Sequence, residues 1–86
     1  LICAICAAPS ILGHKGLLKN KTAVCFPGFE DELTGAKVSD DFVVTDGNII
    51  TAKGMGSAVE FGLATVKKIK GEDFAEIMKK SLQCPY

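Results

Sequence analysis

The chain has 86 residues, with ten basic and ten acidic side chains and therefore no formal net charge at neutral pH. A neutral chain lacks the positive field that draws proteins to nucleic acids or to anionic membrane surfaces, so we expect neither as a partner. It also has no run of 18 apolar residues, so no membrane-spanning helix is predicted.

The first five residues, LICAI, form an unbroken apolar run. Such a run predicts a strand that is buried on both faces, as in the centre of a parallel sheet covered by helices. A natural chain rarely begins inside a central strand, because that strand needs a neighbour on each side. We therefore expect residues 1–86 to be the C-terminal part of one larger domain, whose N-terminal half is missing.

Cys6 follows this strand directly, and Pro9 has the fixed φ that suits the first turn of a helix. The helix is predicted to begin between Ala7 and Pro9 and to reach about Leu12. At such a strand-to-helix turn, backbone N–H groups and the helix dipole favour a thiolate and lower the pKa of a thiol. Cys6 is therefore a candidate nucleophile. The alternative is a buried, inert cysteine that packs as a small apolar side chain.

Cys3 and Cys6 form a C-x-x-C pair, which raises the alternatives of a metal site or a redox dithiol. A zinc site needs further ligands, and Cys25, Cys84 and His14 lack that spacing. A thioredoxin-like pair starts a helix, whereas Cys3 lies inside the predicted strand. We interpret Cys3 as a core residue and expect no metal or other cofactor. Four thiols outside a disulfide pattern indicate a cytoplasmic protein.

The middle of the chain is predicted to form short β segments. A strand is predicted from Lys21 to Phe26, followed by one helical turn in the acidic segment 30–32. Two β-rich runs then flank Asp46-Gly47, a pair that is typical of a tight hairpin turn. The second run, residues 48–52, is expected to return to the main sheet.

Two helices are predicted to close the chain. Residues 54–57 form a glycine-containing turn into the first, where Ser57 and Glu60 have the spacing of a capping box. Gly71 ends this helix, and residues 72–82 form the second. A set of apolar residues shares one face of that second helix and is predicted to pack into the core: Phe74, Ile77, Met78 and Leu82.

Residues 4–9, AICAAP, resemble the nucleophile-elbow motif of the ThiJ/PfpI superfamily, in the branch of the parkinsonism-associated protein deglycase. Residues 51–64 resemble the strand, Gly-x-Gly-Ser turn and helix of the same branch. The resemblance covers nearly the whole chain, although members are about twice as long. It implies an α/β three-layer sandwich with a largely parallel sheet. This fold is flavodoxin-like and class I glutamine amidotransferase-like, and the chain supplies its C-terminal portion.

The resemblance also assigns roles to residues. It implies that Cys6 is the nucleophile or redox thiol and that the backbone N–H of Ala7 holds an oxyanion. Phe26, where several members carry a histidine, and Gly54 are expected to line the substrate pocket. Peptidase-like members have a histidine directly after the elbow cysteine. Ala7 occupies that position here, which disfavours amide hydrolysis.

The activity that the resemblance implies is glyoxalase or deglycase chemistry on small reactive aldehydes, or the older assignment to thiazole monophosphate biosynthesis. The alternative is an oxidative-stress sensor or chaperone without turnover, in which an oxidant converts Cys6 to a sulfinate. The implied partners are the missing N-terminal half, whose glutamate completes the site, and a second copy in a homodimer.

Overall fold

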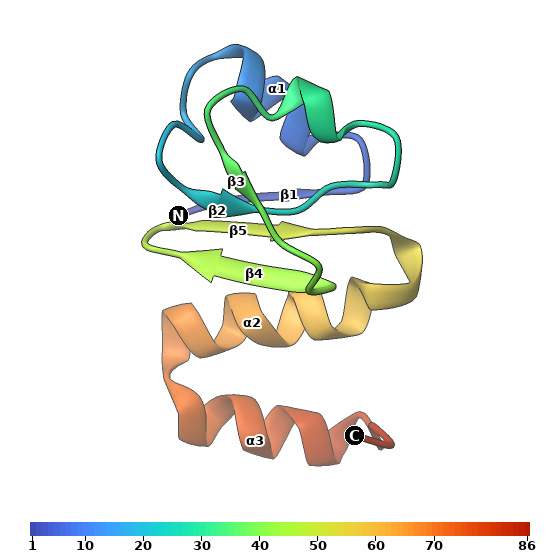
Figure 1. The fold of residues 1–86 in the computed structure, drawn as a ribbon. Helices are drawn as coiled ribbons and strands as arrows, with labels where there is room; N and C mark the ends of the chain where they lie inside the picture. The colour runs from blue at the N-terminus through green and yellow to red at the C-terminus, as the bar shows by residue number, and fades with distance from the viewer.

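The computed structural model describes all 86 residues and arranges them in layers around a three-stranded sheet (Figure 1). The sheet has the order β1 (Ile2–Ile5), β5 (Ile49–Ala52) and β4 (Val43–Asp46). The pair β1–β5 is parallel and the pair β5–β4 is antiparallel. The predicted α/β class is confirmed.

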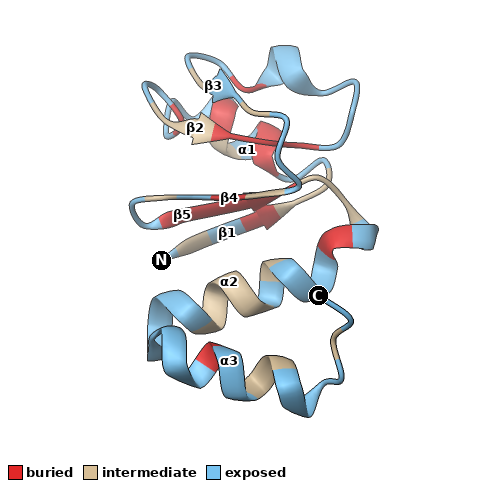
Figure 2. Cartoon of the chain, turned by 60° about the horizontal axis from the view of Figure 1, so that its bottom comes forward, coloured by how far each residue is buried: buried red, intermediate tan, exposed pale blue.

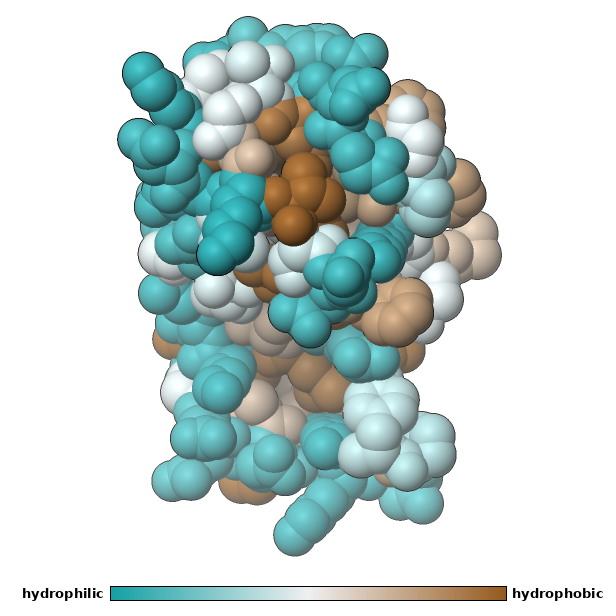
Figure 3. Space-filling model, viewed as in Figure 1, coloured by the Kyte–Doolittle hydropathy of each residue, from teal (hydrophilic) through white to brown (hydrophobic).

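Helices and a second small sheet cover the two faces of this main sheet. One face carries α1 (Pro9–His14), the 3₁₀ turn η1 (Glu30–Glu32) and the parallel pair β2 (Thr22–Ala23) and β3 (Lys37–Val38). The opposite face carries α2 (Ala58–Lys70), and α3 (Glu72–Ser81) lies outside α2 (Figure 1). Figure 3 shows apolar atoms among hydrophilic ones on the surface of the layer that contains β2 and β3. None of the helices has the length and apolar character needed to span a membrane.

The predicted strand at the start of the chain exists, and within these 86 residues it lies at an edge of the sheet. All four residues of β5 are buried, whereas β1 lies at an edge of the sheet, where Cys3 is exposed. The prediction that Cys3 is a core residue is therefore wrong for this chain. Its Sγ lies 3.7 Å from Oγ1 of Thr65 on α2. An apolar run specifies a strand that can be buried on both faces, but its position in the sheet depends on which strands pair with it.

The strand predicted from Lys21 to Phe26 is only two residues long, because the backbone after β2 bonds elsewhere. The N–H of Val24 donates to Oγ1 of Thr51 in β5 at 3.0 Å, and the N–H of Phe26 donates to the carbonyl of Cys6 at 2.8 Å. This segment therefore ties the α1 layer to the C-terminal ends of β1 and β5.

The hairpin around Asp46-Gly47 is confirmed. Asp46 pairs with Ile49, which leaves Gly47 and Asn48 as a two-residue turn, and Gly47 has the positive φ of +62° that such turns require. The carboxylate of Asp46 also accepts a hydrogen bond from the N–H of Thr22 at 2.7 Å. The hairpin thus returns the chain to the main sheet as predicted and is linked to β2.

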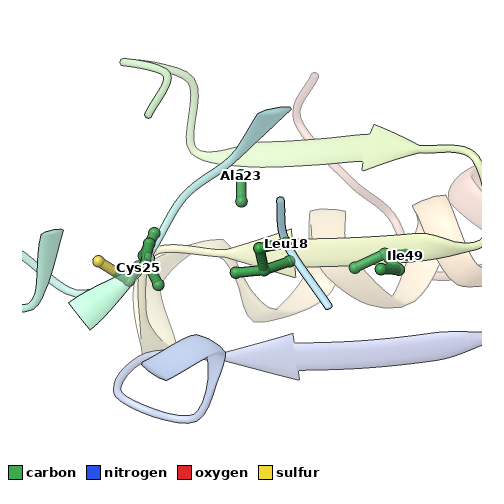
Figure 4. Packing of buried hydrophobic residues seen from close by; sticks show 5 residues of the cluster. Leu18, Ala23, Cys25 and Ile49 are labelled. Atoms are coloured by element: carbon green, nitrogen blue, oxygen red, sulfur yellow. The ribbon is translucent and has the colours of Figure 1, made fainter. Parts of the chain in front are cut away.

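The core lies between the main sheet and the α1 layer. Figure 4 shows its buried cluster, which is made up of Leu18, Ala23, Cys25, Leu33 and Ile49. Gly13 allows α1 to approach this layer closely, since a Cβ there would lie 2.1 Å from the carbonyl oxygen of Glu32. The helix therefore extends through Gly13 to His14, two residues beyond the predicted end near Leu12.

The helices on the other face of the main sheet, α2 and α3, are much less buried than the core. No residue of α2 is buried, and Ala75 is the one buried residue of α3 (Figure 2). The side chains of Phe74 and Ile77 are 43% and 63% exposed. The prediction that the apolar stripe of α3 packs into the core is therefore wrong for this chain.

Candidate active site

Cys6 occupies the turn between β1 and α1 in a conformation that non-glycine residues rarely adopt. Its φ is +66°, in the left-handed region. The N–H of Cys6 donates to the carbonyl of Ala52 at 3.0 Å, and the Cys6 carbonyl accepts from the N–H of Phe26 at 2.8 Å. These two bonds hold the turn at the C-terminal ends of β1 and β5, where open α/β sheets bind their ligands.

The N–H of Ala7, directly after Cys6, has no hydrogen-bond acceptor in the chain. The neighbouring donors are used, since the N–H of Ala8 donates to Ile5 at 3.1 Å and the N–H of Ser10 donates to Ala7 at 3.1 Å. Because α1 has only six residues, its dipole is short. The individual N–H groups of the turn therefore contribute more to the local electrostatic field than the helix dipole does. The N–H of Ala7 is therefore a free hydrogen-bond donor in the residue next to Cys6.

The other cysteines lie in different environments. Cys25 is buried, and this burial, followed by the nearby carboxylate of Glu30, raises the pKa of its thiol. Cys3 and Cys6 are three positions apart, which places their Cα atoms about 10 Å apart along an extended strand. A disulfide needs Cα atoms within about 7 Å, so the dithiol alternative does not fit this backbone. No group of three or more His, Cys, Asp or Glu side chains is placed to hold a metal ion.

His14 lies at the exposed end of α1, away from the turn at Cys6. Its Nε2 is 2.7 Å from Oε2 of Glu32, and both side chains are more than half exposed. His14 therefore lies at the surface, where it joins α1 to η1.

A pocket of about 480 Å³ lies beside the cysteine turn, and Phe26 and Gly54 both line it. A Cβ on Gly54 would lie 3.3 Å from the Phe26 ring, so the two residues are packed against each other. Cys6 is not among the lining residues, but its backbone bonds reach Phe26 and the residue before Lys53. The lining consists of Phe26, Pro27, Phe42, Lys53, Gly54, Met55, Gly56, Ser57 and Glu60.

The predicted capping box at the start of α2 does not form. Ser57 belongs to the 3₁₀ turn η2 (Met55–Ser57), and its hydroxyl donates back to the carbonyl of Gly54 at 2.9 Å. No side chain caps α2. The reason is that the tight turn directs the hydroxyl toward Gly54 and away from the N–H groups of the next turn. Ser57 therefore fixes the backbone that lines the pocket.

Sequence reasoning did not single out Lys53 or Phe42, although both line this pocket. The Nζ of Lys53 lies 5.2 Å from the centroid of the Phe42 ring and donates to the carbonyl of Asp40 at 3.2 Å. A signal was present in the sequence: Lys53 follows the apolar run of β5 in the way that Cys6 follows that of β1. Parallel strands bring their C-terminal ends to the same edge of a sheet.

Comparison with known proteins identifies the family to which this arrangement belongs. The model of the DJ-1/PfpI family matches residues 1–68, which include the cysteine turn, the pocket and most of α2. The chain belongs to the DJ-1/PfpI family. The expected ThiJ/PfpI relationship is thus confirmed, and with it the flavodoxin-like α/β fold.

Individual members of the DJ-1/PfpI family align with the whole or nearly the whole chain. Protein dj-1beta of Drosophila melanogaster is 36% identical over 88 residues, which cover 100% of this chain and 47% of that protein. The glutathione-independent glyoxalase DJR-1.2 of Caenorhabditis elegans is 37% identical over 84 residues, covering 95% and 45%. The structure of oxidized DJ-1 from Toxoplasma gondii superposes with a TM-score of 0.91 at 32% identity, covering 100% and 47%. The chain therefore spans about half the length of these DJ-1/PfpI proteins.

Proposed function

We propose that Cys6 is the nucleophile of a glyoxalase or deglycase that acts on small 2-oxoaldehydes such as methylglyoxal. The observation that carries the proposal is the turn itself. Cys6 is held at φ +66° at the ends of two parallel strands, next to an Ala7 N–H that has no acceptor. The relative named as a glutathione-independent glyoxalase supports this choice among the activities of the family.

The chemistry begins when the Cys6 thiolate adds to the aldehyde carbon and forms a C–S bond. The carbonyl electron pair moves to oxygen, and the Ala7 N–H stabilises the oxyanion. A base then removes the proton from that carbon, and a proton is returned at the adjacent carbon, which gives a thioester. Water attacks the thioester and breaks the C–S bond, releasing a 2-hydroxy acid and the thiolate. One carbon is oxidised while its neighbour is reduced, so no external oxidant is needed.

The proton transfer requires a base that this chain does not place at Cys6. No carboxylate or imidazole of the chain hydrogen-bonds to its thiol, and His14 is bonded to Glu32 instead. We propose that the chain is the C-terminal part of a single DJ-1/PfpI domain and that a glutamate in the other half supplies the base. The length of the relatives supports this division, since the chain spans about half of them.

We propose that the full-length protein forms a homodimer and is located in the cytoplasm, as expected from the sequence and its family resemblance. The four free thiols support a reducing compartment. Light scattering on the full-length protein measures the number of subunits, and a monomeric mass excludes the dimer. Fractionation of cells tests the location, and recovery of the protein in an oxidising compartment excludes the cytoplasm.

The test of the proposed reaction is the conversion of methylglyoxal to lactate by the full-length protein and by its Cys6→Ser variant. We expect the variant to lose at least about 10³-fold in rate, because a hydroxyl is a much weaker nucleophile than a thiolate. Cys25→Ser is the matched control, since it removes a buried thiol that the reaction does not use. Turnover that survives in Cys6→Ser contradicts the proposal.

The second candidate is a redox sensor in which a hydroperoxide oxidises Cys6. With hydrogen peroxide as the hydroperoxide, each equivalent transfers one oxygen to sulfur and leaves as water, so two equivalents give a sulfinate. The free Ala7 N–H can hold the sulfinate oxygen, and the structure of the Toxoplasma gondii relative is that of oxidized DJ-1. A mass gain of two oxygens on Cys6, in a protein without methylglyoxal turnover, favours this role over the enzyme. Peroxide that leaves Cys6 unmodified excludes it.

A further inference from the structure

The main sheet ends at β4, whose outer edge has no partner strand. β4 is hydrogen-bonded to β5 on one side and is the last strand in the order of the sheet. The N–H of Lys53 donates to the carbonyl of Phe42 at 3.0 Å, which fixes the alternation of this antiparallel ladder. Val44 and Asp46 lie two and four residues after Phe42, so their backbone N–H and C=O groups also point toward β5. The backbone groups of the alternate residues point outward.

These alternate residues are Val43 and Thr45. Neither of them makes a backbone hydrogen bond outside the sheet ladder, and no side chain bonds to their backbone groups. They therefore leave two N–H donors and two C=O acceptors along the outer edge of β4, in the arrangement that a further strand completes. Thr45 is exposed and Val43 is partly exposed, so the edge is open in these 86 residues.

A groove of about 490 Å³ lies beside this edge, between β4 and α2. The side chains of Val43 and Thr45 line it from the strand, because alternate residues share one face of a sheet. Four residues on one face of α2 complete the lining, namely Glu60, Ala64, Lys67 and Lys68. α2 runs in the same direction as β4 (Figure 1), so the glutamate lies toward the start of the strand and the two lysines lie toward its end.

The two ends of the groove carry opposite charges that are available to a ligand. Glu60 and Lys68 are exposed and make no ion pair, whereas Lys67 lies 3.8 Å from Glu72. Seven helical residues separate Glu60 from Lys67, a rise of about 10 Å. An extended peptide of five residues spans about 13 Å. A short strand with one charged residue at each end therefore matches the groove in length and in charge.

We propose that this edge and groove bind an extended peptide, which adds to β4 as an antiparallel strand and has an acidic N-terminal end and a basic C-terminal end. The antiparallel direction places the acidic end beside Lys68 and the basic end beside Glu60. Main-chain hydrogen bonds to Val43 and Thr45 hold the peptide, and the two charges select its sequence and direction. The N-terminal half proposed above has a separate open edge at β1, on the opposite side of the sheet.

The test is isothermal titration calorimetry of the full-length protein with the peptide Asp-Val-Thr-Val-Lys, acetylated and amidated at its ends. We expect saturable binding. The peptide Lys-Val-Thr-Val-Asp has the same composition with the end charges exchanged, and it should bind at least about fivefold more weakly. A third peptide, N-methylated at the central threonine, lacks a donor to the edge of β4 and should also bind at least about fivefold more weakly.

Variants of the protein test the same two contributions. Lys68→Glu should reverse the preference between the two charged peptides. Lys70→Glu is the matched control, because Lys70 is an exposed lysine of the same helix that does not line the groove, and it should retain the preference. Thr45→Pro removes an outward N–H and keeps the bonds from β4 to β5, so it should weaken both peptides at least about fivefold. Circular dichroism checks that this variant is folded.

Equal binding of the two charged peptides, or full binding of the N-methylated peptide, overturns the proposal, and neither result depends on the folding of a variant. Absence of binding to the full-length protein also overturns it. A loss of subunits in Thr45→Pro, measured by light scattering, shows that the edge pairs with a second copy and has the same consequence. Cys6→Ser should bind the peptide as the wild type does, because Cys6 does not line the groove, so this result stays separate from the methylglyoxal assay.

Discussion

Cys6 and Cys25 show how position in the fold sets the chemistry of a residue type. Cys6 is held in a left-handed conformation that costs about 1–3 kcal/mol, and its two backbone hydrogen bonds offset this strain. Cys25 lies in the buried cluster, where burial raises the pKa of its thiol and keeps it protonated as the pH rises. The neighbour of Cys6 offers a free N–H, whereas Cys25 is buried among apolar side chains. The two thiols are therefore expected to differ in reactivity.

Gly13 gives a prediction at the same scale. In Gly13→Ala the new Cβ would meet the backbone of Glu32 and Leu33 at 2.1 and 2.8 Å, so α1 must move away from η1. We expect a decrease of about 1–3 kcal/mol in the free energy of unfolding, measured by denaturant titration of the full-length protein. Gly62→Ala in α2 is the control, because nothing lies within 4 Å of its Cβ. It should stabilise by up to about 1 kcal/mol. Equal stabilisation by both substitutions would contradict the close approach of α1.

At the scale of elements, the type of each segment, helix or strand, was predicted better than the segments that it packs against or pairs with. The hairpin and the two C-terminal helices follow from local signals, namely Asp46-Gly47, Gly71 and the spacing of apolar residues. Residues 1–5 are all apolar and β5 contains Thr51, but β5 alone is paired on both sides. Pairing is a non-local property, so an apolar run alone does not show which strand of this chain is paired on both sides.

The candidate site was predictable to the same extent. The cysteine turn follows from an apolar strand that runs into a proline-containing helix start, and both are local features. The placement of Phe26 and Gly54 at one pocket was inferred from family resemblance, since the two residues are 28 positions apart. Lys53 was missed because its position beside Cys6 depends on the register between β1 and β5. The capping box failed because a 3₁₀ turn redirected the Ser57 hydroxyl.

For the whole molecule, the exposed apolar surfaces support the proposal that further polypeptide surrounds this chain. The outer edge of β1 has no partner strand, and Leu1, Ile77 and Leu82 are each more than half exposed. Each apolar side chain left in water forgoes about 1.5–3 kcal/mol of burial, whereas a domain has only about 5–15 kcal/mol of total stability.

We therefore predict that the 86-residue chain, expressed alone, aggregates or unfolds without a cooperative transition. Circular dichroism during heating, combined with light scattering, measures both properties. The full-length protein is the control and should unfold cooperatively. A soluble monomer of residues 1–86 with a sharp thermal transition would show that no other half is required for folding.

The central claim is that the turn at Cys6 produces the reactive thiol of this protein. The most direct test is competitive alkylation of the full-length protein with limiting iodoacetamide across a range of pH, followed by peptide mapping of all four cysteines. We predict that Cys6 is labelled before Cys3, Cys25 and Cys84 at neutral pH. Cys25 should be labelled last, at a pH above that of an ordinary thiol, because its folded-state pKa is raised. Labelling of any other cysteine before Cys6 would contradict the account.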